Sequence, residues 1–193
     1  MAIGRDRTQR ERTNKNGVSV NNIIRPAAPG DIASITAIYA EAVRHGTASF
    51  EIDPPDEEEM MRRQRALLDG GFPYLVAETD GVLSGYAYAG PYRARPAYRF
   101  SIEDSVYVAP HEQRRGVGKI LLSHLIAEAS QRGFRQMIAV IGDSAAQTPS
   151  IELHRNAGFR MIGVVESVGY KFDRWLDTLL MQRPLGNGAD TSP

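Results

Sequence analysis

Apolar residues recur with helical and strand periods between Ile23 and Arg183, which predicts one folded domain over 23–183. Helical spacing indicates four helices, at about 31–45, 56–69, 116–131 and 150–156. After a short apolar start at Ile23 and Ile24, strand patterns fall at about 74–78, 82–88, 98–108, 137–141, 159–168 and 175–183. Helices, then an antiparallel meander, then alternating strands and helices are typical of a mixed α+β domain. We therefore expect a mostly antiparallel central sheet flanked by helices, and not a doubly wound nucleotide-binding fold.

Glycine, proline and acidic residues mark the ends of these segments. Gly46 is expected to end the first helix and Gly70-Gly71 the second. The second helix follows Asp53-Pro54-Pro55, and the acidic residues 56–59 fill its first turn, where they suit the helix dipole. Asp80-Gly81 lies between two strand patterns and predicts a tight hairpin.

Both ends of the chain differ in composition from the domain. Residues 1–22 hold almost no large apolar side chains, and basic residues outnumber acidic ones there. Such a stretch buries too little surface to offset its ordering entropy, so we expect a flexible N-terminal arm at 1–22. Residues 184–193 are similarly poor in apolar residues, and we expect a flexible C-terminal tail there.

The composition excludes several classes of function. The chain has 193 residues, with 23 Lys and Arg against 23 Asp and Glu, which argues against a globally basic nucleic-acid binder. No cysteine is present, so disulfides, thiolate metal sites and a cysteine nucleophile are ruled out. No apolar run approaches the ~20 residues that span a bilayer. The four histidines lack paired metal-ligand spacing, so we expect no metal site. Since no segment is long and apolar enough to cross a membrane, we expect a cytoplasmic protein.

The segment from Gln113 to Lys119 lies between a strand and an amphipathic helix and has the sequence QRRGVGK. Its two glycines let backbone N–H groups converge on an anion, and the helix that starts there adds its positive end. Arg114, Arg115 and Lys119 supply full charges, and a pyrophosphate would suit this turn. The spacing fits neither a dinucleotide fingerprint nor a P-loop. From these seven residues alone, an ordinary exposed loop is an equally good interpretation.

The strand before this turn carries candidate chemistry on one face. With period two, Arg99, Glu103 and Tyr107 lie on one face, and the apolar side chains of Ile102, Val106 and Val108 lie on the other. Asp104 breaks the apolar pattern, so we expect a bulge or local twist nearby. Glu103 is a candidate base. From the strand alone, a solvated strand face or an ion pair with a nearby arginine is the better explanation of this residue.

Arg93 and Arg95 stand two residues apart in a loop bounded by prolines. Their guanidinium groups could bind a carboxylate or a tetrahedral phosphinate-like group in bidentate fashion. Arginines kept for solubility are the alternative.

Four motifs give the chain a resemblance to a known superfamily. Gln-x-x-Gly-x-Gly after Val106-Tyr107-Val108 resembles the acetyl-CoA site of the GNAT N-acetyltransferases, and the segment 153–159, LHRNAGF, resembles their last helix and turn. Segments 88–108 and 169–177 are similar to the subgroup that acetylates phosphinothricin, methionine sulfoximine and methionine sulfone. This resemblance covers about 23–183 and implies the GNAT acyltransferase fold with acetyl-CoA as co-substrate.

The resemblance also implies roles for particular residues. Glu103 would deprotonate the amine, and His154, where relatives often have Tyr, could protonate the leaving thiolate. The positions that match substrate-lining residues are Arg93, Ala94, Arg95, Glu103, Asp104 and Ser105. The positions that match acetyl-CoA contacts are Val106, Tyr107, Val108, Arg114, Arg115, Gly116, Val117, Gly118, Lys119, Gln147 and Ser150. Gln147 departs from the family, which usually has Asn there.

Two further expectations rest on analogy. A homodimer with sites near its interface is expected because the resembling enzymes are commonly dimers. Acetylation of another amine (a peptide N-terminus, a polyamine or an aminoglycoside) and a CoA-binding module without turnover remain the alternative functions.

Overall fold

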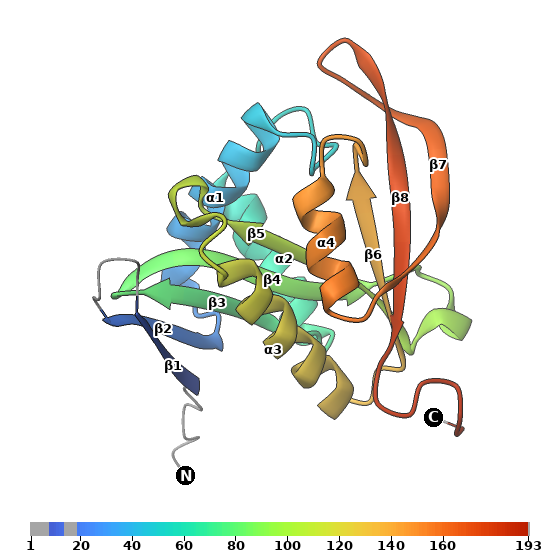
Figure 1. Cartoon of the computed structure of the whole chain (residues 1–193), viewed down its shortest axis with the longest axis horizontal. Coiled ribbons are helices and arrows are strands. Elements are labelled where there is room, and N and C mark those ends of the chain that lie inside the picture. Colours follow the sequence, from blue (N-terminus) through green and yellow to red (C-terminus); the bar gives the residue numbers. More distant parts are fainter. Residues whose placement is uncertain (1–7, 14–18, 193) are drawn as a thin grey trace.

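The structure, a computed structural model, describes residues 8–13 and 19–192, and these form a mixed α+β fold around one sheet (Figure 1). The helices are α1 (Ile32–His45), α2 (Glu57–Asp69), α3 (Val117–Gln131) and α4 (Thr148–Asn156). The strands are β1 (Thr8–Thr13), β2 (Ser19–Pro26), β3 (Tyr74–Thr79), β4 (Val82–Pro91), β5 (Ser101–Val108), β6 (Gln136–Gly142), β7 (Arg160–Lys171) and β8 (Arg174–Pro184).

The sheet has the strand order β1-β2-β3-β4-β5-β6-β8-β7. Every neighbouring pair is antiparallel except β5 and β6, which are parallel. The connection between these two parallel strands is α3. The candidate turn at 113–119 therefore lies within the connection between the only two parallel neighbours among the described strands.

Two hydrophobic cores cover the two faces of the sheet. On one face, α3 packs against alternate positions of the strands, including Ala87 of β4 and Ile102 of β5. On the other face, α1 and α2 cover the intervening positions, including Tyr86 of β4. Successive side chains of a strand point to opposite faces of the sheet. The face opposite Ile102 is covered by α1 and α2 and forms a second core.

The predicted helix ends and the predicted turn between β3 and β4 are confirmed. Asp56 caps α2, with its Oδ1 accepting a hydrogen bond of 2.8 Å from the N–H of Glu59. Gly46 and Gly70 follow α1 and α2 as expected. Asp80 and Gly81 have φ of 50° and 83°, the left-handed conformation that a two-residue hairpin turn requires.

Both termini differ from the sequence-based expectation. Thr8–Thr13, within the range expected to be a flexible arm, pairs antiparallel with Ser19–Pro26, which begins inside that range and ends beyond it. Residues 1–7 and 14–18 lie outside the described residues. Backbone pairing needs no apolar side chains, so composition gives no sign of it. In the range expected to be a flexible tail, Leu185 is 1% exposed and the Arg135 guanidinium donates hydrogen bonds to Thr191 and Ser192.

The strand at 98–108 begins later than expected. Pro96 opens a short 3₁₀ turn that runs to Tyr98, and β5 starts only at Ser101. Arg99 therefore lies before the strand and not on its face with Glu103.

β7 and β8 form a long hairpin at one edge of the sheet, and in Figure 1 its far end extends beyond the rest of the molecule. Its turn is Phe172-Asp173, with φ of 52° and 55°. The neighbouring Lys171 is 3% exposed and extends back into the body of the protein.

Candidate active site

β5 and β6 separate partway along their length. Their pairing ends at Asp104 and Ala139, although β5 continues to Val108 and β6 to Gly142. Beyond that point, among the described residues, β5 pairs only with β4, and β6 pairs only with β8. The two strands therefore leave a gap between them.

Backbone donors of β5 face this gap. The N–H of Ala109 donates to Ser84 on the β4 side at 2.9 Å, and backbone direction alternates along a strand. The N–H groups of Val106 and Val108 therefore point away from β4, toward the gap. Among the described strands none pairs with them, so they are free to bind an extended ligand or a developing oxyanion.

The turn at 113–119 presents further donors next to the gap. Gly116 is in the left-handed conformation with φ of 85°, and Arg114 has φ of 59°. Gly116 starts α3 without a side-chain cap, so the first N–H groups of the helix lack intrahelical acceptors. Gly118 faces both neighbours of the gap, since a Cβ there would lie 3.6 Å from Val108 and 3.5 Å from Leu153 of α4. The turn has the form of an anion cradle.

Glu103 lies on β5 one residue before the strands separate, opposite Gly90 of β4. Its side chain is on the α1–α2 face and is half-buried. Burial raises the pKa of the Glu103 carboxyl above its ordinary value, the charge of Asp104 raises it further, and the charge of Arg93 lowers it in part. A carboxylate with a raised pKa is suited to accept a proton near neutral pH.

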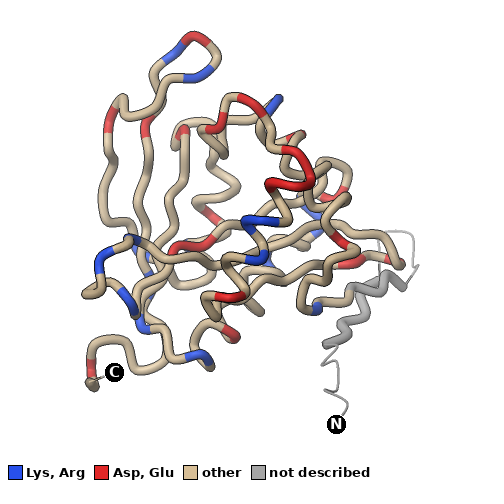
Figure 2. The backbone as a smooth tube through the Cα atoms, turned by 180° about the vertical axis from the view of Figure 1, so that it is seen from behind, with Lys and Arg blue, Asp and Glu red and all other residues tan. Residues whose placement is uncertain are grey.

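Arg93 lies in the loop between β4 and β5, the segment 92–100. This loop is rich in basic residues (Figure 2). Its guanidinium carbon stands 5.1 Å from the centre of the Tyr92 ring, and Tyr92 contacts Tyr98 edge to face. These contacts hold the cation near Glu103 while leaving it exposed. Arg95 and Ala94 are exposed in the same loop.

A cluster of tyrosines extends from Glu103 into the second core. Ser105 hydrogen-bonds Tyr88 on β4, and burial raises the pKa of that phenol. The ring of Tyr107 stacks on Tyr86 at 5.2 Å and meets Tyr39 of α1 edge to face at 5.0 Å. Tyr107 is therefore a packing residue through its side chain, and its main chain pairs with β4 and not with the gap.

His154 and Asp104 form a buried pair on the opposite face. His154 Nε2 lies 2.9 Å from Asp104 Oδ2, and their side chains are 6% and 1% exposed. Burial lowers the pKa of His154, but the hydrogen bond and charge of Asp104 outweigh it and leave the pKa raised. Of the bulge or local twist expected near Asp104, the bulge is wrong, since the β4–β5 register runs without a shift. A partner on α4, and not a backbone irregularity, explains the polar residue at an apolar position.

Both ring nitrogens of His154 are engaged with protein groups. Nδ1 lies 2.7 Å from the carbonyl oxygen of Ser150, and because a carbonyl only accepts, Nδ1 carries a hydrogen. Nε2 then shares one proton with Asp104. The resemblance matches Asp104 to a substrate-lining position. Its side chain, which bonds His154 of α4, lies on the face of the sheet opposite that of Glu103.

The remaining candidate residues surround the gap with few direct contacts. Arg115 pairs with Glu112 at 3.0 Å, while the side chains of Arg114 and Lys119 are exposed. Gln147 lies at the start of α4, and its Nε2 reaches Thr47 Oγ1 at 3.4 Å.

The loop between α1 and α2, residues 46–56, lies at the open end of the gap, and the sequence patterns did not predict it as part of the site. Phe50 packs where a Cβ of Gly142 or Gly169 would stand. Lys171 Nζ donates to the carbonyls of Val43, Gly46 and Ser49 at 2.7, 2.9 and 2.9 Å. The glycines late in β6 and inside β7 were the available signal, because glycine within a strand often marks a close approach.

Asp143 links the same loop to the segment before α4. Its Oδ2 accepts from Thr47 Oγ1 at 2.8 Å and also pairs with Arg174. The Arg174 guanidinium holds the pKa of the Asp143 carboxyl below its usual value. Loops from three parts of the chain are thus joined at one end of the gap.

Among residues 8–13 and 19–192, no group of three or more His, Asp or Glu side chains is arranged to hold a metal ion.

The helices within the described ranges are all too short or too polar to span a lipid bilayer.

Comparison with known families gives one match of direct relevance. The model of the acetyltransferase (GNAT) family matches residues 35–159, well over half of the chain. The matched range includes the gap, the turn at 113–119 and both Glu103 and His154.

Individual proteins match over most of their length. Phosphinothricin N-acetyltransferase of Alcaligenes faecalis is 55% identical over 170 residues, 88% of this chain and 86% of the relative. The L-methionine sulfoximine/L-methionine sulfone acetyltransferase of Salmonella typhimurium is 40% identical over 166 residues, 86% of this chain and 96% of the relative. A phosphinothricin acetyltransferase from Sinorhizobium meliloti, solved in complex with acetyl-CoA, superposes with a TM-score of 0.86 at 47% identity and covers 89% of this chain and 92% of its own.

Proposed function

The chain belongs to the GNAT family of acetyltransferases, and on that premise we propose that it acetylates the α-amine of a small amino-acid-like acceptor of the phosphinothricin, methionine sulfoximine or methionine sulfone type. It is an acyltransferase whose co-substrate is acetyl-CoA. The named activities of its relatives support this acceptor class. The observation that carries the proposal is Glu103, half-buried at the point where β5 and β6 separate and within electrostatic reach of Arg93.

The residues around the gap fit acetyl-CoA. The uncapped start of α3 and the left-handed turn at Gly116 suit a pyrophosphate, and the charges of Arg114, Arg115 and Lys119 complement it. The free N–H groups of Val106 and Val108 suit the extended pantetheine arm and the thioester carbonyl. We assign Gln147 and Ser150 to the same arm.

In the proposed reaction the acceptor amine attacks the thioester directly. Glu103 removes the proton from the ammonium, directly or through a water, because only the neutral amine has a lone pair. The nitrogen then forms a bond to the acetyl carbon, and a backbone N–H of β5 stabilises the oxyanion. The C–S bond then breaks, the amide forms, and the second proton of the former ammonium passes from the nitrogen to the CoA thiolate.

We do not assign that last proton to His154 acting alone. Its Nδ1 is committed to Ser150 and its Nε2 to Asp104, so neither nitrogen is free toward the gap.

Arg93 and Arg95 are assigned to the acceptor. Two guanidinium groups in an exposed loop suit a carboxylate or a phosphinate and repel polyamines and aminoglycosides, which are cations. This charge argument favours an amino-acid-like acceptor over the alternatives.

A thiol-release assay with a panel of acceptors tests the proposal. We expect turnover with acetyl-CoA and phosphinothricin, methionine sulfoximine or methionine sulfone, and little with spermidine, an aminoglycoside or a peptide. Glu103→Gln should lower kcat by about 10²- to 10⁴-fold, the usual contribution of a general base, while binding of acetyl-CoA is retained. Turnover of the peptide or the polyamine alone would refute the acceptor class, and near wild-type turnover by Glu103→Gln would remove its role as base.

We also propose a homodimer. β7 is an edge strand, and the β7–β8 hairpin exposes a series of large apolar side chains: Met161, Ile162, Val164, Val165, Val168, Tyr170, Phe172 and Trp175. Contiguous exposed apolar surface of this kind is typical of protein contacts. Sedimentation at micromolar concentration should give twice the chain mass for the wild type and one chain mass for Val168→Asp. A monomeric wild type would contradict the proposal.

We place the enzyme in the cytoplasm, where acetyl-CoA is available. Fractionation of cells that express the chain should recover its activity with the cytoplasmic enzymes, and recovery with membranes would contradict this.

A further inference from the structure

Asp104 occupies a singular place in the sheet. It is the last residue of β5 paired with β6, opposite Ala139, and the strands separate immediately after it. Its side chain is on the α3–α4 face and 1% exposed. Burial of a carboxylate raises the free energy of the folded state unless the group is hydrogen-bonded. The partner of Asp104 is therefore important for the local structure.

The partner of Asp104 comes from α4, the helix that follows β6. His154 is fixed within its own helix by the bond from Nδ1 to Ser150, and its Nε2 reaches across to Asp104. The His154 ring also contacts Phe159 edge to face at 5.0 Å. One buried hydrogen bond therefore joins α4 to β5 at the point of separation.

α4 in turn forms one side of the gap. Leu153, next to His154, lies where a Cβ of Gly118 would make contact at 3.5 Å, and the same Cβ would contact Val108 and Val106 at 3.6 and 3.9 Å. β5, the start of α3 and α4 thus meet around Gly118. The position of α4 against β5 sets the width of this junction.

We propose that Asp104 is a positioning residue for acetyl-CoA: through its hydrogen bond to His154 it fixes α4 against β5 and so holds the β5–β6 gap at the width the co-substrate needs. This inference rests on the place proposed above for acetyl-CoA. It gives Asp104 a role in binding the co-substrate and none in contacting the acceptor. It makes His154 part of the same positioning pair.

A double-mutant cycle measured by calorimetry with acetyl-CoA tests the pair. Loss of one hydrogen bond is worth about five- to tenfold in an equilibrium, so Asp104→Ala and His154→Ala should each raise the Kd for acetyl-CoA by that factor. Because both variants remove the same contact, the double variant should bind no more weakly than either single one. The KM for the acceptor should stay unchanged in all three. Additive losses, or unchanged Kd values, would overturn the inference.

Asp104→Asn provides the conservative rescue. Its amide donates an N–H to Nε2 of the neutral imidazole and keeps the link without the charge. We expect a Kd for acetyl-CoA within about twofold of wild type, since the hydrogen bond is preserved. Binding as weak as that of Asp104→Ala would show that charge and not the link matters, and would overturn the inference.

A destabilised control separates this role from loss of folding. Ile35→Ala removes a fully buried side chain of α1 on the other face of the sheet and should lower the Tm at least as much as Asp104→Ala. Its Kd for acetyl-CoA should remain that of wild type at temperatures where circular dichroism shows it folded. An equal loss of affinity in the control would overturn the inference. If the wild type itself binds no acetyl-CoA, the proposed function fails, whereas equal binding by wild type and Asp104→Ala overturns only the positioning role.

Discussion

Lys171 holds the loop between α1 and α2, and its removal gives a prediction whose size follows from the structure. All three ammonium hydrogens of this buried side chain are used, by the carbonyls of Val43, Gly46 and Ser49. Lys171→Met keeps the length of the apolar stem and removes all three bonds. At about 0.5–1.5 kcal/mol net for each bond, the free energy of unfolding should fall by about 3 kcal/mol.

The same loss can be expressed as a melting temperature. For a chain of this size each kcal/mol corresponds to about 2–4 °C, so the Tm should fall by about 6–12 °C. Urea unfolding followed by circular dichroism measures the free energy, and Lys119→Met is the matched control because Lys119 is exposed. The control should change stability by less than about 0.5 kcal/mol. A loss below about 1 kcal/mol for Lys171→Met, or an equal loss in the control, would refute the reasoning.

Three further predictions concern the active site. Burial and the charge of Asp104 raise the pKa of the Glu103 carboxyl, and only its ionised form accepts a proton, so kcat/KM should fall with decreasing pH through a pKa above the ordinary glutamate value. A pH–rate profile should show this fall at low pH for the wild type and not for Glu103→Gln. The same fall in both enzymes would contradict the assignment of Glu103 as base. Gly118→Ala should leave the Tm unchanged or slightly higher, since the added Cβ makes only ordinary contacts in a helix. The same Cβ should raise the KM for acetyl-CoA because it crowds the gap. Thermal unfolding measures the Tm and steady-state kinetics the KM, and an unchanged KM would argue against the turn as the binding site. Arg93→Ala should raise the KM for the acceptor. Because it removes a nearby cation, it should also raise the pKa of the Glu103 carboxyl, so the fall of kcat/KM at low pH should move to higher pH. An unchanged pH–rate profile would show that the two side chains do not interact.

Local patterns in the sequence predicted the elements of the domain well. Capping by Asp56 and the turn at Asp80-Gly81 depend on residues close together in the chain, so the sequence contains the whole cause. The two faces of β5 were also predicted, because period two is fixed by the backbone.

Features that depend on distant partners were not predicted. The polar Asp104 at an apolar position suggested a bulge, whereas its cause is His154, fifty residues further along the chain. The pairing of β1 with β2 uses backbone groups that composition does not report. The turn at Phe172-Asp173 is local, but it lacks the usual Asn-Gly or Asp-Gly signal of a hairpin. For the site, the strand and turn motifs located the gap, but the engagement of both His154 nitrogens became visible only when α4 was packed.

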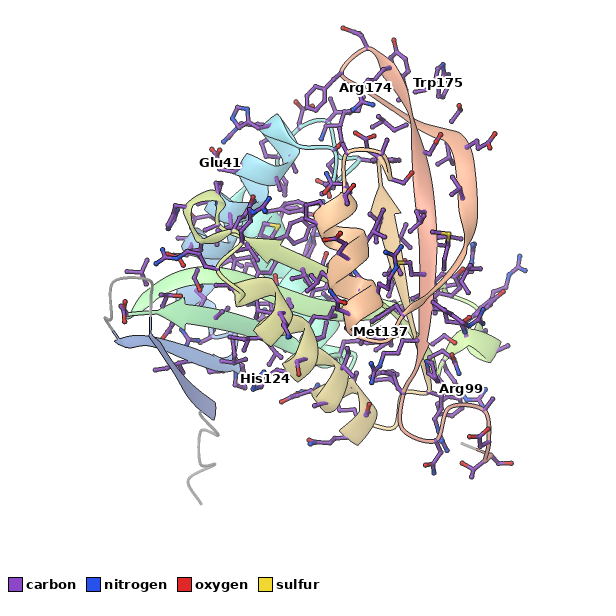
Figure 3. All side chains as sticks on the ribbon, viewed as in Figure 1. Glu41, Arg99, His124, Met137, Arg174 and Trp175 are labelled. Atoms are coloured by element: carbon purple, nitrogen blue, oxygen red, sulfur yellow. The ribbon has the colours of Figure 1, made fainter. Side chains whose placement is uncertain are left out.

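The hairpin described at the sheet edge carries the sole tryptophan of the chain. Trp175 is 64% exposed, contacts Tyr170 at 5.3 Å between ring centres, and lies near the outer end of the hairpin (Figure 3). Intrinsic fluorescence of this protein is therefore a selective probe of that end. Emission excited at the red edge of the indole band should be that of a water-exposed indole and should shift to shorter wavelength when self-association covers the ring.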